Sequence, residues 1–210
     1  MSIKRILPVL MVFILGCIGR EVKSKSPVTP NFLSWTNKFS IKEGKGELFL
    51  MMTKNRQGSY FDFEYDANNK RLSGNLIGMF GLKLASFEVN GNSLNVMSRN
   101  NDPIRLDTLF SGTGLTPLML SRFLAYDIVA PNLRSLIPVS DGYLSTSGNS
   151  NIFFSREGYP TKVVIVTNTG EIVIEYGDFR RIKSTIQPFS VVITQNRIRI
   201  EMKLSQINLK

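Results

Sequence analysis

Histidine is absent from this chain of 210 residues, and cysteine occurs only once, at Cys17. Without histidine the chain lacks the commonest general base and the commonest metal-binding side chain. A single cysteine excludes a disulfide bond within the chain. These absences argue against Ser-His hydrolases and histidine-based metal enzymes. We therefore expect a protein that is not an enzyme and that holds no metal and no cofactor.

The N-terminal hydrophobic run is too short to cross a membrane. Residues 6–15 are mostly apolar, whereas a membrane-spanning helix needs roughly 20 such residues. Lys4 and Arg5 precede the run, which is typical of a secretory signal. Its end, Leu15-Gly16-Cys17, resembles the lipobox of bacterial lipoproteins. The resemblance implies that residues 1–16 are a signal peptide and that Cys17 carries covalent diacylglycerol and an N-acyl lipid. An ordinary N-terminal anchor with an incidental cysteine is the alternative.

Lipid on Cys17 would hold the rest of the chain at a membrane. Ile18 follows the cysteine, where Asp would favour the inner membrane. The resemblance therefore implies a lipid anchor in the outer membrane, with the folded part in the periplasm. Residues 17–30 lack apolar periodicity and predict a flexible tether whose basic residues can face anionic head groups. Lipidation of the only thiol also argues against a thiol-dependent enzyme.

Acidic residues are fewer than basic ones. The chain has 16 Asp and Glu and 26 Lys and Arg, which gives a net charge of +10. From residue 17 onward there are 24 basic and 16 acidic residues, a net charge of +8. Such a surface attracts nucleic acid, anionic lipid or polysaccharide. Because an exported protein seldom meets nucleic acid, we expect membrane lipid as the partner. The alternative is that the charge only maintains solubility.

Residues 31–210 have the pattern of one β-rich domain, and the 14 Phe and six Tyr of the chain suit such a core. Short, regularly spaced strands favour an antiparallel sheet. Asn90-Gly91 predicts a tight hairpin, and a parity change after Leu84 predicts a bulge near Ala85 and Ser86. The predicted strands cover residues 47–53, 59–66, 71–78, 82–89, 93–98, 142–147, 152–156, 161–167, 171–176, 183–186, 191–194 and 197–204.

Three carboxylates alternate with three aromatic residues along residues 59–66. Phe61, Phe63 and Tyr65 share one face of the strand. Asp62, Glu64 and Asp66 share the other, which suggests either a Ca²⁺ site or a solvated face. Side chains two residues apart on a strand lie about 7 Å apart, too far for one ion without loops, so we expect the solvated face.

Two helices are predicted. Residues 31–39 place Trp35 on an apolar helical face. Thr116 as N-cap and Pro117 at the first position predict a second helix that ends near residue 127, with Met119 and Phe123 on its apolar stripe. A phosphate-binding loop at residues 111–114 is the competing interpretation, but that loop lacks a Gly-Lys-Ser/Thr ending.

Residues 78–81 read Gly-Met-Phe-Gly between two predicted strands. The glycines predict a tight turn with Met79 and Phe80 at its tip. Apolar residues at a loop tip have to be covered by something. Phe80 either folds back into the core or forms a hydrophobic finger that touches lipid or a lipidated client.

The order of these elements, together with the lipobox, resembles the LolA/LolB lipoprotein-carrier superfamily. Residues 74–89 are similar to the strand, apolar-tipped loop and strand of LolB-type proteins, and residues 160–209 to their closing strands. The resemblance implies a mainly β (α+β) fold, a curved antiparallel half-barrel with a few helices forming a lid over an apolar cavity. It implies that Met79 and Phe80 contact membrane or client. The candidate cavity-lining residues are Trp35, Phe61, Phe63, Met119 and Phe123.

From this resemblance we expect an outer-membrane lipoprotein with a LolB-like acyl-chain-binding domain that accepts or inserts lipoproteins or lipids. Its expected partners are membrane lipid, lipoprotein acyl chains and a periplasmic carrier, and we expect a monomer. The alternative is a structural or assembly lipoprotein of the envelope that uses the same fold as a protein-interaction surface.

Overall fold

The computed structural model describes residues 39–52, 55–104, 116–168 and 170–210. The predicted signal peptide and tether, the lipidation site Cys17, Trp35 and the 111–114 loop lie outside the described residues. So does the predicted helix at residues 31–39, except for Phe39. The proposed boundaries at residues 16 and 30 therefore stay predictions.

Within the described residues the chain forms one sheet of twelve strands, one α-helix and two short 3-10 turns. The strands are β1 (Ile41–Met52), β2 (Asn55–Asp66), β3 (Arg71–Ile77), β4 (Lys83–Asn90), β5 (Ser93–Ser98), β6 (Ile137–Val139), β7 (Gly142–Ser147), β8 (Ser150–Ser155), β9 (Pro160–Thr167), β10 (Gly170–Ile182), β11 (Thr185–Gln195) and β12 (Ile198–Leu209). The helix is α3 (Pro117–Ala125), and the 3-10 turns are η4 (Met79–Gly81) and η5 (Leu133–Ser135).

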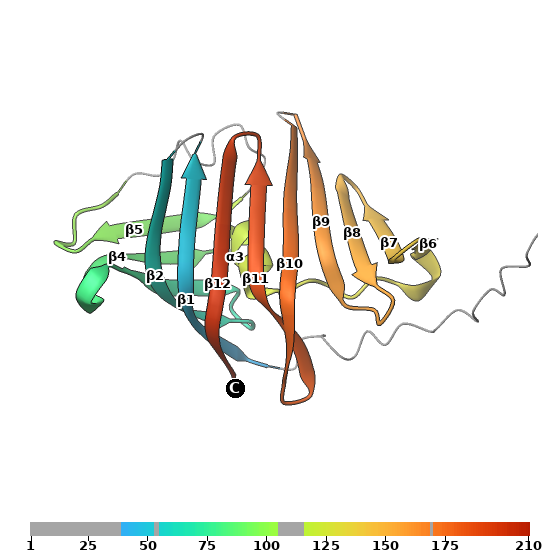
Figure 1. The fold of residues 1–210 in the computed structure, drawn as a ribbon, viewed down its shortest axis with the longest axis horizontal. Coiled ribbons are helices and arrows are strands. Elements are labelled where there is room, and N and C mark those ends of the chain that lie inside the picture. The colour runs from blue at the N-terminus through green and yellow to red at the C-terminus, as the bar shows by residue number, and fades with distance from the viewer. Residues whose placement is uncertain (1–38, 53–54, 105–115, 169) are drawn as a thin grey trace, which may run out of the picture.

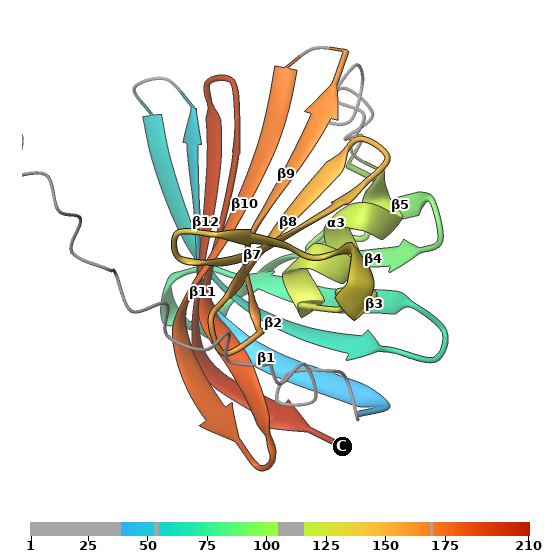
Figure 2. The ribbon, with the colours of Figure 1, turned by 90° about the vertical axis from the view of Figure 1, so that its right-hand side faces the viewer.

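The strands follow the order β5-β4-β3-β2-β1-β12-β11-β10-β9-β8-β7-β6, and every neighbouring pair is antiparallel. The first and last strands therefore pair in the middle of the sheet. Figure 1 looks onto the outer face, with α3 behind the strands. Figure 2 shows that the sheet curves strongly and that α3 lies on its concave side. This confirms the predicted mainly β fold, a curved antiparallel half-barrel.

The alternating pattern of β2 sets the two faces of the sheet. Phe61, Phe63 and Tyr65 are buried on the concave face, whereas Asp62, Glu64 and Asp66 are on the outer face. Side chains along a strand point alternately to opposite faces, so the register carries this division to the neighbouring strands. The partners of the three aromatic residues on β3 are Leu76, Gly74 and Leu72. The predicted solvated carboxylate face is confirmed for Glu64, which is exposed.

Gly44 on β1 makes room for this aromatic row. Gly44 pairs with Phe63, and a Cβ at position 44 would lie 2.3 Å from the Phe63 ring. Any larger residue would displace that ring, because real Cβ contacts are never so short. A glycine in a strand interior often marks such a close approach.

The helix begins and ends as its sequence predicts. The Thr116 hydroxyl accepts a hydrogen bond from the Met119 amide (3.2 Å), and Pro117 occupies the first turn. The helix ends at Ala125 because Tyr126 adopts a left-handed conformation (φ 61°), a common way to end a helix. The Tyr126 hydroxyl donates to the Pro160 carbonyl (2.8 Å), which fixes this end to the sheet.

Several predicted strand bounds differ from the structure. β1 begins at Ile41, before the predicted start at residue 47. Residues 183–186 and 191–194 are not two strands, because β11 runs unbroken from Thr185 to Gln195 through Pro188. The predicted bulge near Ala85 and Ser86 is confirmed, because the β3–β4 register shifts between Leu76 and Ile77 and leaves Leu84, next to Ala85, as the extra residue.

Candidate functional site

The concave face near α3 is an aromatic and aliphatic cluster. The Phe61 and Phe63 rings stack with centroids 5.9 Å apart and planes 9° apart. Both side chains are buried, with 5% and 6% of their surface exposed. Met119 and Phe123 of α3 are partly buried and pack against the same cluster. The structure thus brings together the four described residues of the predicted lining, while the fifth, Trp35, lies outside the described residues.

The apolar surface continues across the other half of the sheet. Six aliphatic residues of β9, β10 and β11 are buried in the same cluster: Val163, Ile165, Ile172, Ile174, Val191 and Ile193. Leu48 of β1 and Ile200 of β12 are partly buried beside them. Strands from both halves therefore share one hydrophobic interior, and burying apolar surface there contributes about 25 cal/mol per Å².

A buried lysine lies in this interior. Lys42 of β1 is 0% exposed. Its Nζ donates to the Ala125 carbonyl at the C-terminal end of α3 and to Oε1 of Gln187, both at 2.9 Å. The Gln187 side chain is also buried, and its Nε2 has no hydrogen-bond partner among the described residues. Burial lowers the pKa of Lys42 from 10.5 to about 7, because desolvation penalises the charged form.

Three further hydrogen bonds attach the C-terminal end of α3 to the sheet. The Tyr176 hydroxyl donates to the Phe123 carbonyl (3.3 Å), and Tyr126 donates to Pro160 as described above. The Tyr65 hydroxyl donates to Oδ2 of Asp127 (2.6 Å). Nε of Arg122 forms an ion pair with the same oxygen (3.4 Å). Burial is the largest cause that raises the pKa of Tyr65 and of Tyr176, so both remain neutral donors at physiological pH. The C-terminal end of α3 is therefore fixed to the sheet.

The turn between β3 and β4 exposes apolar side chains. Phe80 is 96% exposed and adopts a left-handed conformation (φ 62°), followed by Gly81 at φ 74°. Leu82 and Leu84 are 49% and 51% exposed. Figure 1 shows η4 as the short green coil that projects at the left edge of the molecule. Phe80 does not fold back into the core, and the turn has the form of a hydrophobic finger.

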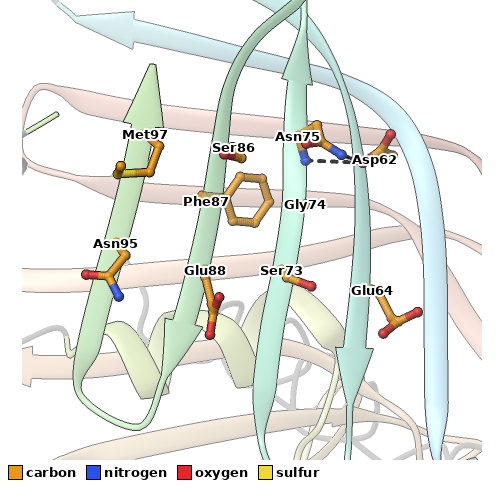
Figure 3. A pocket seen from close by; sticks show the side chains of 10 residues that line it. All are labelled: Asp62, Glu64, Ser73, Gly74, Asn75, Ser86, Phe87, Glu88, Asn95 and Met97. Carbon is orange, nitrogen blue, oxygen red and sulfur yellow. Dashed lines mark hydrogen bonds between the residues drawn. The ribbon is translucent and has the colours of Figure 1, made fainter. Parts of the chain in front are cut away.

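The outer face of β2 to β5 has a different chemistry. A hollow of about 410 Å³ is lined by ten residues: Asp62, Glu64, Ser73, Gly74, Asn75, Ser86, Phe87, Glu88, Asn95 and Met97 (Figure 3). Asp62 accepts hydrogen bonds from the backbone amide (3.1 Å) and the side-chain Nδ2 (2.8 Å) of Asn75. Among the described residues no group of three or more Cys, Asp or Glu is placed to hold a metal ion.

Sequence reasoning missed Lys42 and Gln187. Lys42 stands in a charged, glycine-containing stretch with Glu43, Gly44 and Lys45. Nothing in this pattern distinguishes a buried lysine from an exposed one. The one available signal of burial is strand alternation. Lys42 is an even number of residues from Leu48 and Leu50, so its side chain points to the same, concave face.

Among the described residues, no helix has the length and apolar character that crossing a membrane requires. No protein-family model and no curated protein matches the sequence.

Several solved structures share the fold. A putative outer membrane lipoprotein-sorting protein domain from Vibrio parahaemolyticus superposes with a TM-score of 0.55 at 9% identity, over 83% of this chain and 87% of that one. A LolA superfamily protein from Nitrosomonas europaea gives 0.57 at 12% identity, over 83% and 88%. A DUF1329 family protein from Desulfovibrio piger gives 0.55 at 5% identity, over 83% and 87%. The chain therefore has the LolA-type fold over most of its length.

Proposed function

We propose that this chain is a lipid-anchored protein of the bacterial outer membrane that binds acyl chains on its concave face. Lipid on Cys17 would hold it at the membrane, and the folded part would accept or insert lipoproteins or lipids. The proposed function involves no bond chemistry. Affinity would come from burying acyl methylene groups, at about 0.8 kcal/mol each.

The observation that carries this proposal is the continuous apolar concave face with α3 packed on it. The fold is shared with a putative lipoprotein-sorting domain, which supports the same class of ligand. Because the C-terminal end of α3 is fixed by Lys42 and Tyr176, we propose that acyl chains enter beside its N-terminal half. Met119 lies there and supplies a flexible, polarisable contact.

The exposed Phe80 supports a membrane or client contact at η4. An exposed aromatic ring breaks no core contacts when it enters lipid, and its transfer from water into lipid is favourable. Phe80→Glu should leave the fold intact and abolish transfer of a lipoprotein client into vesicles. Unchanged client insertion by this variant would overturn the role of Phe80.

The buried state of Phe61 and Phe63 favours a second candidate. Side chains that fill the interior leave the fold as a surface for protein partners, which suits a structural or assembly lipoprotein of the envelope. In that case the concave face would be core and not a binding site.

Native mass spectrometry of residues 18–210 separates the two candidates. If the proposal is correct, the purified protein carries additional mass from bound lipid, and delipidated protein takes up a long-chain fatty acid. A clean protein mass that remains unchanged after incubation with fatty acid and phospholipid would favour the second candidate.

A further inference from the structure

Two cations converge on one aromatic ring on the outer face. The Arg56 guanidinium carbon lies 4.3 Å from the centroid of the Phe49 ring, and Lys203 Nζ lies 5.8 Å from the same centroid. The cations come from β2 and β12, the strands that flank Phe49 on β1. Contact with a ring face holds a cation in place by electrostatic attraction. We call Phe49, Arg56, Lys203 and the neighbouring Tyr60 the Phe49 surface.

These cations lack a carboxylate partner within ion-pair distance among the described residues. The acid opposite Phe49 is Glu201, but Arg199 binds it at 2.8 Å. Glu47 is the cross-strand neighbour of Lys203 and is partly buried. Lys45 precedes Glu47 by two residues on β1, lies on the same face and is exposed. The Phe49 surface and Lys45 thus present three cations against two acids, Glu47 and Asp62, the cross-strand partner of Lys45.

Two hollows join the Phe49 surface to the exposed turn. One, of about 240 Å³, is lined by Glu47, Phe49, Gly58, Ser59, Tyr60, Ile77 and Gly78. Gly78 is the residue from which η4 begins. The other, of about 400 Å³, shares Glu47, Tyr60 and Ile77 and extends to Lys45, Asp62 and Lys203. Cations, aromatic residues and the turn that carries Phe80 therefore form one continuous surface.

This combination of groups matches the interface of an anionic bilayer. Phe80, Leu82 and Leu84 are exposed apolar side chains at the turn, and Tyr60 is 54% exposed beside it. Apolar and aromatic side chains enter the boundary of the acyl region, while lysine and arginine stay at the level of the phosphates. Each cation near an anionic membrane surface contributes about fivefold to binding at low screening.

We propose that the Phe49 surface binds the phosphate groups of anionic phospholipids while Phe80 enters the bilayer beside it. The proposal rests on the proposed function for the membrane contact of Phe80, and it adds the head-group class and the face of the sheet that meets the membrane. The domain then lies with the outer face of β1, β2 and β12 toward the bilayer and its concave face turned away from the head groups.

A photo-crosslinking experiment on the full chain tests this orientation. Tyr60→p-benzoylphenylalanine is reconstituted through its N-terminal anchor into vesicles of phosphatidylcholine alone or of phosphatidylcholine mixed with phosphatidylglycerol. We expect the crosslink to lipid to be about fivefold stronger or more in the anionic vesicles and to weaken at high salt. Equal crosslinking in both vesicles would overturn the proposal.

Matched variants assign the effect to the two cations. Arg56→Gln with Lys203→Gln should reduce crosslinking in anionic vesicles to the phosphatidylcholine level. Arg56→Lys with Lys203→Arg keeps both charges and should retain the crosslinking, which controls for folding.

Val166→p-benzoylphenylalanine, on the distant strand β9 and 49% exposed, should crosslink weakly in both vesicles. Val166 lies on the outer face at β9, so strong crosslinking from it, or retention in the glutamine variant, would contradict the assignment to the outer face of β1, β2 and β12. Lipid uptake measured by mass spectrometry tests acyl binding separately.

Discussion

The concave and outer faces are two sides of the same strands, yet they differ in burial, in apolar content and in charge. The concave face gathers buried aromatic and aliphatic side chains from both halves of the sheet around α3. The outer face has shallow hollows, a carboxylate-lined region over β2 to β5 and a cationic, aromatic region over β1, β2 and β12. One-residue alternation along each strand produces this contrast.

Each face also contains residues that depart from its general character. Among the described residues the apolar face contains one buried lysine, Lys42, whose Nζ donates to the Ala125 carbonyl at the end of α3. The polar face bears an exposed apolar finger at Phe80. Exceptions of this kind are expected where a structure serves more than stability. Lys42 fixes the helix on the concave face, and Phe80 marks where the outer face meets another surface.

Phenylalanine truncation on the two faces should show the largest difference. Phe63→Ala removes a ring that is 6% exposed, so we expect the free energy of unfolding to fall by about 3–5 kcal/mol. Phe80→Ala removes a ring that is 96% exposed, so we expect a change within about 0.5 kcal/mol. Urea unfolding of both variants checks this, and similar losses would erase the contrast between the faces.

The buried lysine predicts a smaller, pH-dependent effect. The pKa of Lys42 is about 7 in the folded chain and near 10.5 when exposed. Between these values the unfolded chain binds a proton that the folded chain lacks, so stability should rise from pH 7 to pH 9. The slope from this group is at most about 1.4 kcal/mol per pH unit, and it fades toward zero as the pH falls below 7.

Lys42→Met is the variant that isolates this slope. It removes the titrating group, so its free energy of unfolding should lose the rise between pH 7 and pH 9. The measurement is urea unfolding of both proteins across this window. A slope that persists in Lys42→Met would assign the titration to another residue.

The carboxylates of the outer face should have the smallest effect. Glu64 is exposed beside Asp62 in the hollow of Figure 3. Glu64→Gln should change the free energy of unfolding by no more than about 0.5 kcal/mol. Millimolar Ca²⁺ should leave the melting temperature of the parent chain unchanged. A rise in melting temperature that Glu64→Gln removes would revive the calcium interpretation.

The parts of the fold that were predictable are those encoded locally. The two-residue period of β2 placed Phe61 and Phe63 on one face, and Thr116-Pro117 fixed the start of α3, because strand parity and helix capping depend on near neighbours. The overall half-barrel followed from resemblance in element order and not from any single motif.

What could not be predicted depends on distant partners. Lys42 bonds Ala125, 83 residues away, and Gln187, 145 residues away. Phe49 lies in the predicted strand at residues 47–53, and nothing in that stretch indicates that its ring faces outward beneath Arg56 and Lys203. The gap between the predicted strands 183–186 and 191–194 is absent, because Pro188 lies inside β11 opposite Phe179, where a left-handed Asp178 interrupts the β10 pairing.

The most direct test of acyl binding on the concave face compares two methionines. Met119 of α3 packs against the concave-face cluster, whereas Met97 lines the outer-face hollow. Both are partly buried. Binding of a fluorescent long-chain fatty acid is measured for the parent chain, Met119→Lys and Met97→Lys. We predict that Met119→Lys weakens binding about tenfold or more, because a charge replaces apolar contact, while Met97→Lys stays within about twofold. Absence of binding by the parent chain, or equal loss in both variants, would contradict the account.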